Sequence, residues 1–222
     1  TIDKTTPKEI TTNTTSLIHS ETIEFGLDII EYFPTLEGYN IGGWYEDSYL
    51  INDFRLTTMP GRNITLYAKW DVNNYTITYN LDGGINESNV STYTIESSTI
   101  TLAYPTKVGY AFAGWYDNAE FNGNAINQIQ LGTIGDITLY AKWSINQYTI
   151  TFDSNGGSLV DAITQDYATS VVEPTLPTKE GYMFGGWYSD ALMTTTYKFS
   201  SMPSEDITLY AKWDVINYTI TY

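Results

Sequence analysis

The feature that most constrains this chain is a block of sequence that occurs three times, at a period of roughly 70 residues. The third copy opens with an alternating stretch at 148–152, continues with the Asn-Gly-Gly of 155–157 and closes with Asp-Ile-Thr-Leu-Tyr-Ala-Lys-Trp at 206–213. The second copy keeps closely related forms of these markers, whereas the first keeps only the later ones. Tandem copies fold as similar units that contact their neighbours, so any function must be compatible with repetition.

The period also predicts the domain organisation. We assign residues 1–74 to a divergent, incomplete first repeat with a Thr-rich N-terminal segment, 75–147 to a second repeat, 148–217 to a third, and 218–222 to the opening strand of a further repeat. The first repeat has no recognisable opening strand, and the sequence does not predict whether residues 1–33 complete a folded unit. Because the chain starts without an initiator Met or a signal-peptide pattern, we expect it to be a piece of a longer protein.

Alternation of apolar and polar residues predicts β-strands in each repeat. In the closing strand at 137–143, every second residue is apolar, and these side chains share one face while Tyr140 and Lys142 share the other. The Gly-rich segments 82–84 and 155–157 tolerate a positive φ, which predicts tight turns after the opening strands.

Less regular segments complete the expected fold. Returning strands are expected within 92–102 and 162–172, and the alternation within 22–33 also favours a strand. Segments 117–130 and 189–200 differ between copies, so we expect loops with room for one short helix. The six Trp residues are predicted to be core, because a small unit has few other large side chains to fill its interior.

Composition excludes several classes of function. The net charge of −16 is spread along the chain, and a negative surface repels nucleic-acid phosphates and anionic membrane faces. The absence of Cys removes disulfides, thiolate metal sites and Cys nucleophiles together. No apolar run approaches the ~18 residues that a transmembrane helix needs, so we expect no membrane insertion.

The combined markers resemble a known family. They are the segments 148–152, 155–157, 177–182 (Pro-Thr-Lys-Glu-Gly-Tyr), 186–188 (Gly-Trp-Tyr) and 206–213. Together they resemble the Listeria-Bacteroides repeat, or internalin B-repeat-like module, and the spacing of five markers within one period is specific. The resemblance covers the second and third repeats well and the first in part.

The resemblance implies bacterial secreted or surface-anchored proteins with tandem modules of a β-grasp-like fold and no catalysis. With the strand pattern, it leads us to expect a mainly β fold with minor α (α+β), as tandem small β-grasp-like modules arranged end to end as a rod. It also implies a location outside the cell, at the cell surface or cell wall or secreted.

Catalytic and metal sites are not expected. The chain's one His is His19, which lies outside the repeated pattern, so no Ser-His-Asp or Cys-His site recurs with the repeats. The segment 153–156 looks like the start of a calcium loop, but the twelfth position of that loop holds Thr164 in place of the bidentate Glu. We therefore predict no enzyme activity, no cofactor and no metal.

A candidate contact face lies on the closing strands, on the side opposite the apolar residues. Its members are Tyr67, Tyr140, Tyr210, Lys69, Lys142 and Lys212. Exposed aromatic rings at matching positions of successive repeats could stack on sugars, so a carbohydrate-binding array is an alternative function.

The function that we favour is a semi-rigid spacer or stalk within a bacterial surface protein, with a contribution to adhesion. Its expected partners are adjacent repeats of the same chain, with a host or cell-wall glycan or protein as a further candidate. A third alternative is a head-to-tail filament, in which Tyr218, Ile220 and Tyr222 form a donor strand that pairs with a vacant sheet edge of a neighbouring molecule.

Overall fold

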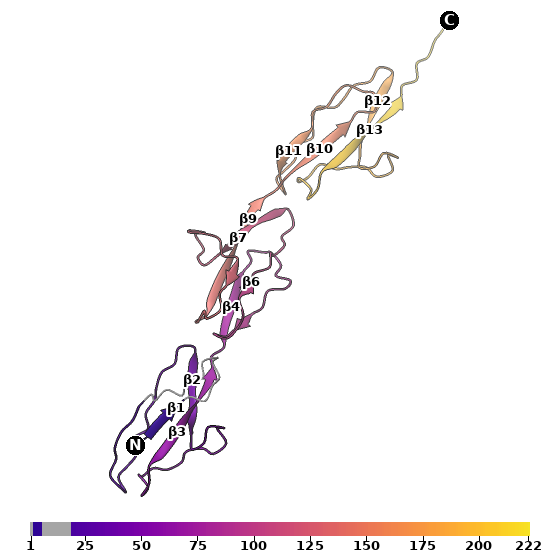
Figure 1. Cartoon of the computed structure of the whole chain (residues 1–222). Coiled ribbons are helices and arrows are strands. Elements are labelled where there is room, and N and C mark those ends of the chain that lie inside the picture. Colours follow the sequence, from indigo (N-terminus) through magenta and orange to yellow (C-terminus); the bar gives the residue numbers. More distant parts are fainter. Residues whose placement is uncertain (1, 6–18) are drawn as a thin grey trace. The chain divides into compact units, whose positions relative to one another are not determined.

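The computed structural model describes residues 2–5 and 19–222, and Figure 1 colours its strands by their place in the sequence. We call the three repeats modules 1, 2 and 3. Contacts between Cα atoms divide the chain into two compact units, described in turn below: Thr1–Thr78 with Asn89–Leu102 and Asn127–Thr138, and Tyr79–Ser88 with Ala103–Ile126 and Leu139–Tyr222.

The first unit contains a three-stranded sheet with β3 at its centre. The strands are, in spatial order, β1 (Ile2–Thr5), β3 (Ile64–Val72) and β2 (Tyr39–Tyr45). The pair β1–β3 is parallel and the pair β2–β3 is antiparallel, with a register shift between Ile41 and Gly43. The core of this unit is a cluster of Trp44, Met59, Ile64, Leu66 and Ala68.

The second unit contains a four-stranded sheet. The strands are, in spatial order, β11 (Ile163–Asp166), β10 (Gln147–Asp153), β13 (Ile207–Val215) and β12 (Tyr182–Tyr188). Here too the opening strand β10 is parallel to the closing strand β13, while the two outer pairs are antiparallel. Its core includes Ile150, Trp187 and Leu209, which are at most 3% exposed.

Module 2 has the same strand order as module 3. Its sheet runs β5 (Thr92–Tyr93), β4 (Tyr75–Asn80), β9 (Ile137–Ile145) and β7 (Tyr110–Tyr116), and a separate pair joins β6 (Ile100–Thr101) to β8 (Gln128–Ile129). The predicted returning strands are therefore present, although they are short. In module 1, β1 takes the position of the opening strand, which the sequence did not predict.

The expected minor α component and the β-grasp-like module are wrong, because the described residues contain no helix and the fold is all-β. The loop 189–200 shows the physical reason. The Asp190 carboxylate accepts hydrogen bonds from Thr194 N (3.1 Å) and Thr195 N (2.8 Å), and Met193 has φ +55°. The side chain thus satisfies backbone donors that a helical turn would have to satisfy itself.

The loop 117–130 follows the same plan. Asn118 Oδ1 accepts from Asn122 N at 2.9 Å, and Phe121 has φ +55°. Within 22–33, where alternation favours a strand, the structure has only an isolated bridge between Asp28 and Thr58.

The Trp residues follow two patterns. The Trp residues of the Gly-Trp-Tyr strands, Trp44, Trp115 and Trp187, are at most 5% exposed, which confirms them as core. The closing Trp residues, Trp70, Trp143 and Trp213, are half-buried; Trp70 and Trp213 pack against the cores of modules 1 and 3, and Trp143 packs edge-on against Phe112.

Candidate functional site

The predicted contact face holds three half-buried Tyr residues, each opposite another Tyr. The pairs join the Gly-Trp-Tyr strand to the antiparallel closing strand beside it, and they are Tyr45 with Tyr67, Tyr116 with Tyr140, and Tyr188 with Tyr210. Because each of the three rings is half-buried, part of its surface is not open to a ligand. Sugar stacking at this face stays a prediction.

The three Lys residues of this face have different partners. Lys69 Nζ lies 3.0 Å from Asp71 Oδ1, and this hydrogen bond raises the pKa of Lys69. Lys142 Nζ lies 5.2 Å from the ring centroid of Tyr116, and Lys212 Nζ lies 5.6 Å from that of Tyr188. Cations at these distances favour the ring faces, so the Lys residues compete with any sugar for the partner Tyr rings.

A second set of Lys residues clamps the Gly-rich turns, and our sequence reasoning missed it. Lys179 Nζ donates to the Asn155 carbonyl at 2.8 Å and lies 5.8 Å from the Trp213 ring, whose Nε1 donates to the Ser154 carbonyl at 2.8 Å. In module 2, Lys107 makes the equivalent bond to the carbonyl of Asp82. The signal was present in the sequence, because Pro-Thr-Lys recurs in modules 2 and 3 whereas module 1 has Pro-Thr-Leu.

In modules 2 and 3, an Asp directly before the closing strand accepts a hydrogen bond from a backbone N–H of the opening strand. Asp136 Oδ1 accepts from Thr76 N at 2.7 Å, and Asp206 Oδ1 accepts from Thr149 N at 2.8 Å. Each carboxylate therefore ties the start of the opening strand to the start of the closing strand. Module 1 has the neutral Asn63 at this position.

This geometry predicts a pH dependence. The backbone hydrogen bond from Thr76 lowers the pKa of Asp136 below its ordinary value. A lowered folded-state pKa contributes stability that is present above the unfolded pKa of about 3.9 and is lost as pH falls through the folded value. We expect Asp136→Asn to lose part of the stability at pH 7 and to show a shallower fall in Tm below pH 4, as measured by thermal denaturation from pH 7 to pH 2.5. If Tm fell as steeply below pH 4 in Asp136→Asn as in the unmodified chain, this role of Asp136 would be contradicted. Asp47 and Asp190 also have lowered pKa values, so part of the fall in Tm should remain in the variant.

The joins between modules are the best-defined repeated feature. We call Gly38-Tyr39 and Gly109-Tyr110 corners, since each follows a turn and opens a strand. In the first unit, Ile95 lies on the corner: a methyl group added to Gly38 would meet its Cδ1 at 2.7 Å. In the second unit, the ring of Tyr167 lies on Gly109 in the same way. We call Ile95 and Tyr167 knobs.

Hydrogen bonds fix both corners. Gly38 O accepts from Asn73 N and Gly109 O accepts from Asn146 N, each at 2.9 Å. The link between the closing strand and the next opening strand is correspondingly short, with Asn73 and Asn74 at the first join and Asn146 alone at the second.

Further contacts differ between the joins. At the first, the Tyr39 hydroxyl donates to Glu96 Oε1 at 2.6 Å. At the second, the Tyr167 ring packs edge-on against Tyr110 and Tyr148, and its backbone N donates to Asn146 O at 2.9 Å. The knob position is thus conserved in geometry while its chemistry changes.

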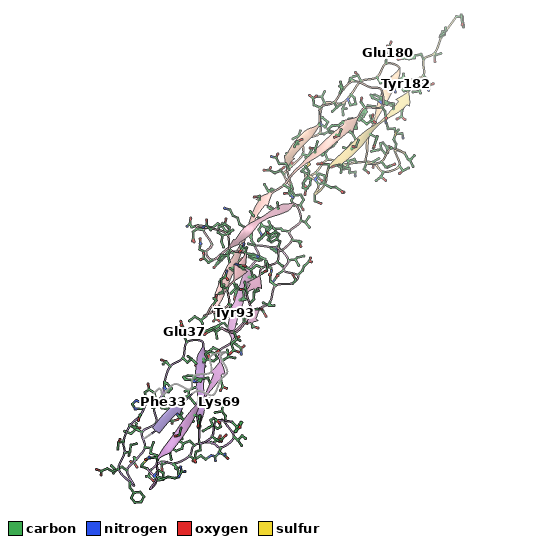
Figure 2. All side chains as sticks on the ribbon, viewed as in Figure 1. Phe33, Glu37, Lys69, Tyr93, Glu180 and Tyr182 are labelled. Carbon is green, nitrogen blue, oxygen red and sulfur yellow. The ribbon has the colours of Figure 1, made fainter. Side chains whose placement is uncertain are left out.

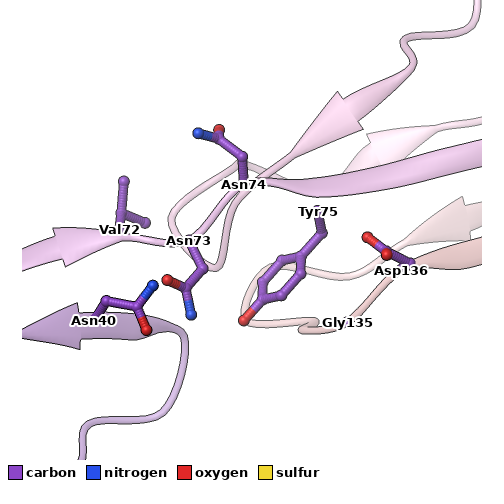
Figure 3. Close-up of a pocket in the computed structure, with 7 residues that line it drawn as sticks. All are labelled: Asn40, Val72, Asn73, Asn74, Tyr75, Gly135 and Asp136. Carbon is purple, nitrogen blue, oxygen red and sulfur yellow. The ribbon is translucent and has the colours of Figure 1, made fainter.

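A hollow of about 590 Å³ opens beside the first join (Figure 3). It is lined by Asn40, Val72, Asn73, Asn74, Tyr75, Gly135 and Asp136. At the second join, Ala111 stands in the place of Asn40, and Asn146 Nδ2 donates to the Tyr148 hydroxyl at 3.2 Å. The polar lining is not repeated, so it does not support a function shared by the modules.

The predicted donor strand is not a strand in this structure. Tyr218, Ile220 and Tyr222 are all more than 70% exposed. The position beside β3 that was expected to be vacant holds β1 of the same chain. Strand donation would therefore need a different edge and stays a prediction.

The described residues hold neither a cluster of metal ligands nor a membrane-spanning helix. No cluster of three or more His, Cys, Asp or Glu side chains there could hold a metal ion. No helix there could cross a membrane.

The fold and its joins define a class, a tandem array of small all-β modules. The Listeria-Bacteroides repeat domain matches residues 5–69, 75–142 and 148–212, and the chain belongs to this family. It is 41% identical over 203 residues, 90% of its length, to a Gly-rich candidate membrane protein of Evansella cellulosilytica. It is 36% identical over 172 residues, 75% of its length, to Internalin H of Listeria monocytogenes.

The chain spans a small part of these relatives, 23% of the Evansella protein and 30% of Internalin H. What it shares with them is a segment of repeats and not a whole protein.

Proposed function

We propose that this chain is a non-enzymatic, semi-rigid spacer segment of a bacterial cell-envelope protein, exposed outside the cell. The names of two relatives, a membrane protein and an internalin, support the envelope location. No set of catalytic residue types recurs with the repeats in the sequence, and this supports a structural role. Adhesion through the surface of the array is a secondary part of the proposal.

The observation that carries the proposal is the repeated join. Both joins combine a link of one or two residues, a hydrogen bond to the corner Gly and a knob on that Gly. A flexible tether would instead need a longer Gly- or Ser-rich linker. A spacer also needs each module to tolerate variation in its loops, and 117–130 and 189–200 vary.

The proposal predicts a restricted distance across the second join. Since the chain has no Cys, Glu120→Cys and Leu192→Cys would place two spin labels at exposed positions in modules 2 and 3. Pulsed electron resonance should give one narrow distance distribution, and Tyr167→Ala should broaden it because the knob is lost.

A matched control is Tyr49→Ala, since Tyr49 is 83% exposed and lies away from the second join in the sequence. It should leave the distribution unchanged. A broad distribution in the unmodified join would show that the segment is a flexible linker, and the spacer proposal would fail.

A further inference from the structure

In each module the opening strand and the closing strand lie side by side. In module 3, β10 pairs with β13 in parallel, with Ile150 opposite Ile207 and Asp153 opposite Tyr210 (Figure 1). In module 1, β1 pairs with β3 in the same parallel sense. In module 2, β4 and β9 are also neighbours in the sheet. The strands through which the chain enters and leaves a module are therefore bonded directly to each other.

This arrangement decides how a pulling force acts on module 3. Tension along the chain enters the module at Gln147, the first residue of β10, and leaves it at Val215, the last residue of β13. Because the strands are parallel, these two residues lie beyond opposite ends of the paired segment, about 35 Å apart along the strands at ~3.3 Å per residue. The force therefore runs along the strands and loads all the hydrogen bonds between them at the same time.

Side chains add to the connection between the same two strands. Asp206 Oδ1 accepts from Thr149 N at 2.8 Å, directly before the paired segment. Beyond its other end, Asn155 Nδ2 donates to Ala211 O at 2.8 Å, and Trp213 Nε1 donates to the carbonyl of the residue before Asn155 at 2.8 Å. Module 2 repeats the Asp bond and the Trp bond. Each of these bonds joins the two strands that tension pulls in opposite directions.

The paired segment is also closed to water on its inner face. Ile150 and Leu209 are 0% exposed, and Phe152 between them is 8% exposed. Water that reaches a stretched backbone bond replaces the lost partner, so a hydrogen bond resists breaking more where water is excluded. The bonds of this segment must therefore give way together before water can enter.

We propose that the modules are load-bearing units, in which the parallel pair of opening and closing strands resists extension of the chain in shear. This role rests on the proposed function, because a spacer in the cell envelope transmits any force that acts on the parts of the protein that it separates. It concerns the strength of a single module, whereas the spin-label distances concern the stiffness of a join. Either result can therefore fail without the other.

A second direction of pulling provides a control within the same module. Tyr182, at the start of β12, is the partner of Val215, at the end of β13, because this pair of strands is antiparallel (Figure 2). A force that separates the two strands at this end acts across them and breaks their hydrogen bonds one after another. Peeling should therefore need less force than shear, although the core and the bonds of the module are the same.

The test is single-molecule force spectroscopy of the full chain, which has no Cys of its own, so that introduced Cys residues define the attachment points. The positions used, Gln147, Met183 and Val215, are all exposed. Gln147→Cys with Val215→Cys loads the parallel pair in shear, and Met183→Cys with Val215→Cys peels the antiparallel pair. At equal loading rate the unfolding force should be at least about twofold higher in shear than in peeling. The shear event should lengthen the chain by about 20 nm, the extended length of 147–215 at ~3.6 Å per residue less its folded length.

Two matched variants test the bonds themselves. Asp206→Ala removes a bond between the loaded strands, so it should lower the shear force and leave the peeling force unchanged. Asp190→Ala removes a bond of the same length to a backbone N–H within the loop 189–200, so it should leave the shear force unchanged. The proposal is wrong if the force in shear is no higher than in peeling, or if Asp190→Ala lowers the shear force as much as Asp206→Ala does.

Discussion

Replacing Trp187 with Ala should lower the free energy of unfolding of module 3 by about 3–5 kcal/mol, the range for removal of a large buried aromatic side chain. Trp187 is 3% exposed, and its ring centroid lies 4.8 Å from that of Phe152 and 5.3 Å from that of Phe184. The neighbouring strands are held by the hydrogen bonds of the sheet, so they should close the cavity only in part. Urea denaturation followed by circular dichroism should show an early transition for the altered module.

The matched control for this loss is Tyr49→Ala in module 1. Tyr49 is 83% exposed, so its removal should change the free energy of unfolding by no more than about 0.5 kcal/mol. A loss below about 1 kcal/mol for Trp187→Ala would mean that the Gly-Trp-Tyr strand is not a core element of module 3.

Local patterns predicted the parts of the fold that depend on local chemistry. Alternation placed Leu139 and Ala141 on one face, and both are at most 2% exposed. The expectation of a positive φ in the Gly-rich turns is confirmed, with Asp82 at +46° and Asn155 at +49°. Both properties follow from a period of two and from the backbone preferences of Asp, Asn and Gly, which the sequence displays directly.

The missed elements depend on distant partners. The strand β1, Ile-Asp-Lys-Thr, shows no apolar alternation, and its pairing with β3 depends on backbone atoms some 60 residues away in sequence. The short helix was expected in segments where a single acceptor, Asp190 or Asn118, organises the loop instead. In each case the tertiary or side-chain contact outweighed the local propensity.

Only the part of the candidate site that lies on one strand was predicted, because the rest depends on partners distant in the sequence. The face shared by Tyr140 and Lys142 follows from alternation, but the rings opposite them belong to another strand, so the cross-strand pairs were not predicted. The knobs carry no common residue type, since Ile95 and Tyr167 are alike only in the turn that presents them. A search for identical residues at a fixed spacing cannot find such a site.

A second large loss of stability is expected when the corner glycine of a join is replaced. It can be measured by comparing Gly109→Ala with Gly181→Ala. Gly109→Ala and Gly181→Ala should share a strain cost of about 1–2 kcal/mol, because φ is +78° and +79° at the two positions. Only Gly109 lies under a knob, so its new methyl group must displace the Tyr167 ring. We expect an additional cost of about 1–3 kcal/mol for Gly109→Ala, the range for forcing extra volume into a packed contact. Urea denaturation of both variants measures the difference.

Amide hydrogen exchange locates the additional cost. The Tyr167 N–H donates to Asn146 O across the second join, so its protection should fall in Gly109→Ala and remain unchanged in Gly181→Ala. Gly38→Ala should behave as Gly109→Ala does, because Ile95 Cδ1 would lie 2.7 Å from its methyl group. Equal costs at all three glycines would mean that the knobs yield without resistance. The coupling between modules would then come from the covalent links alone.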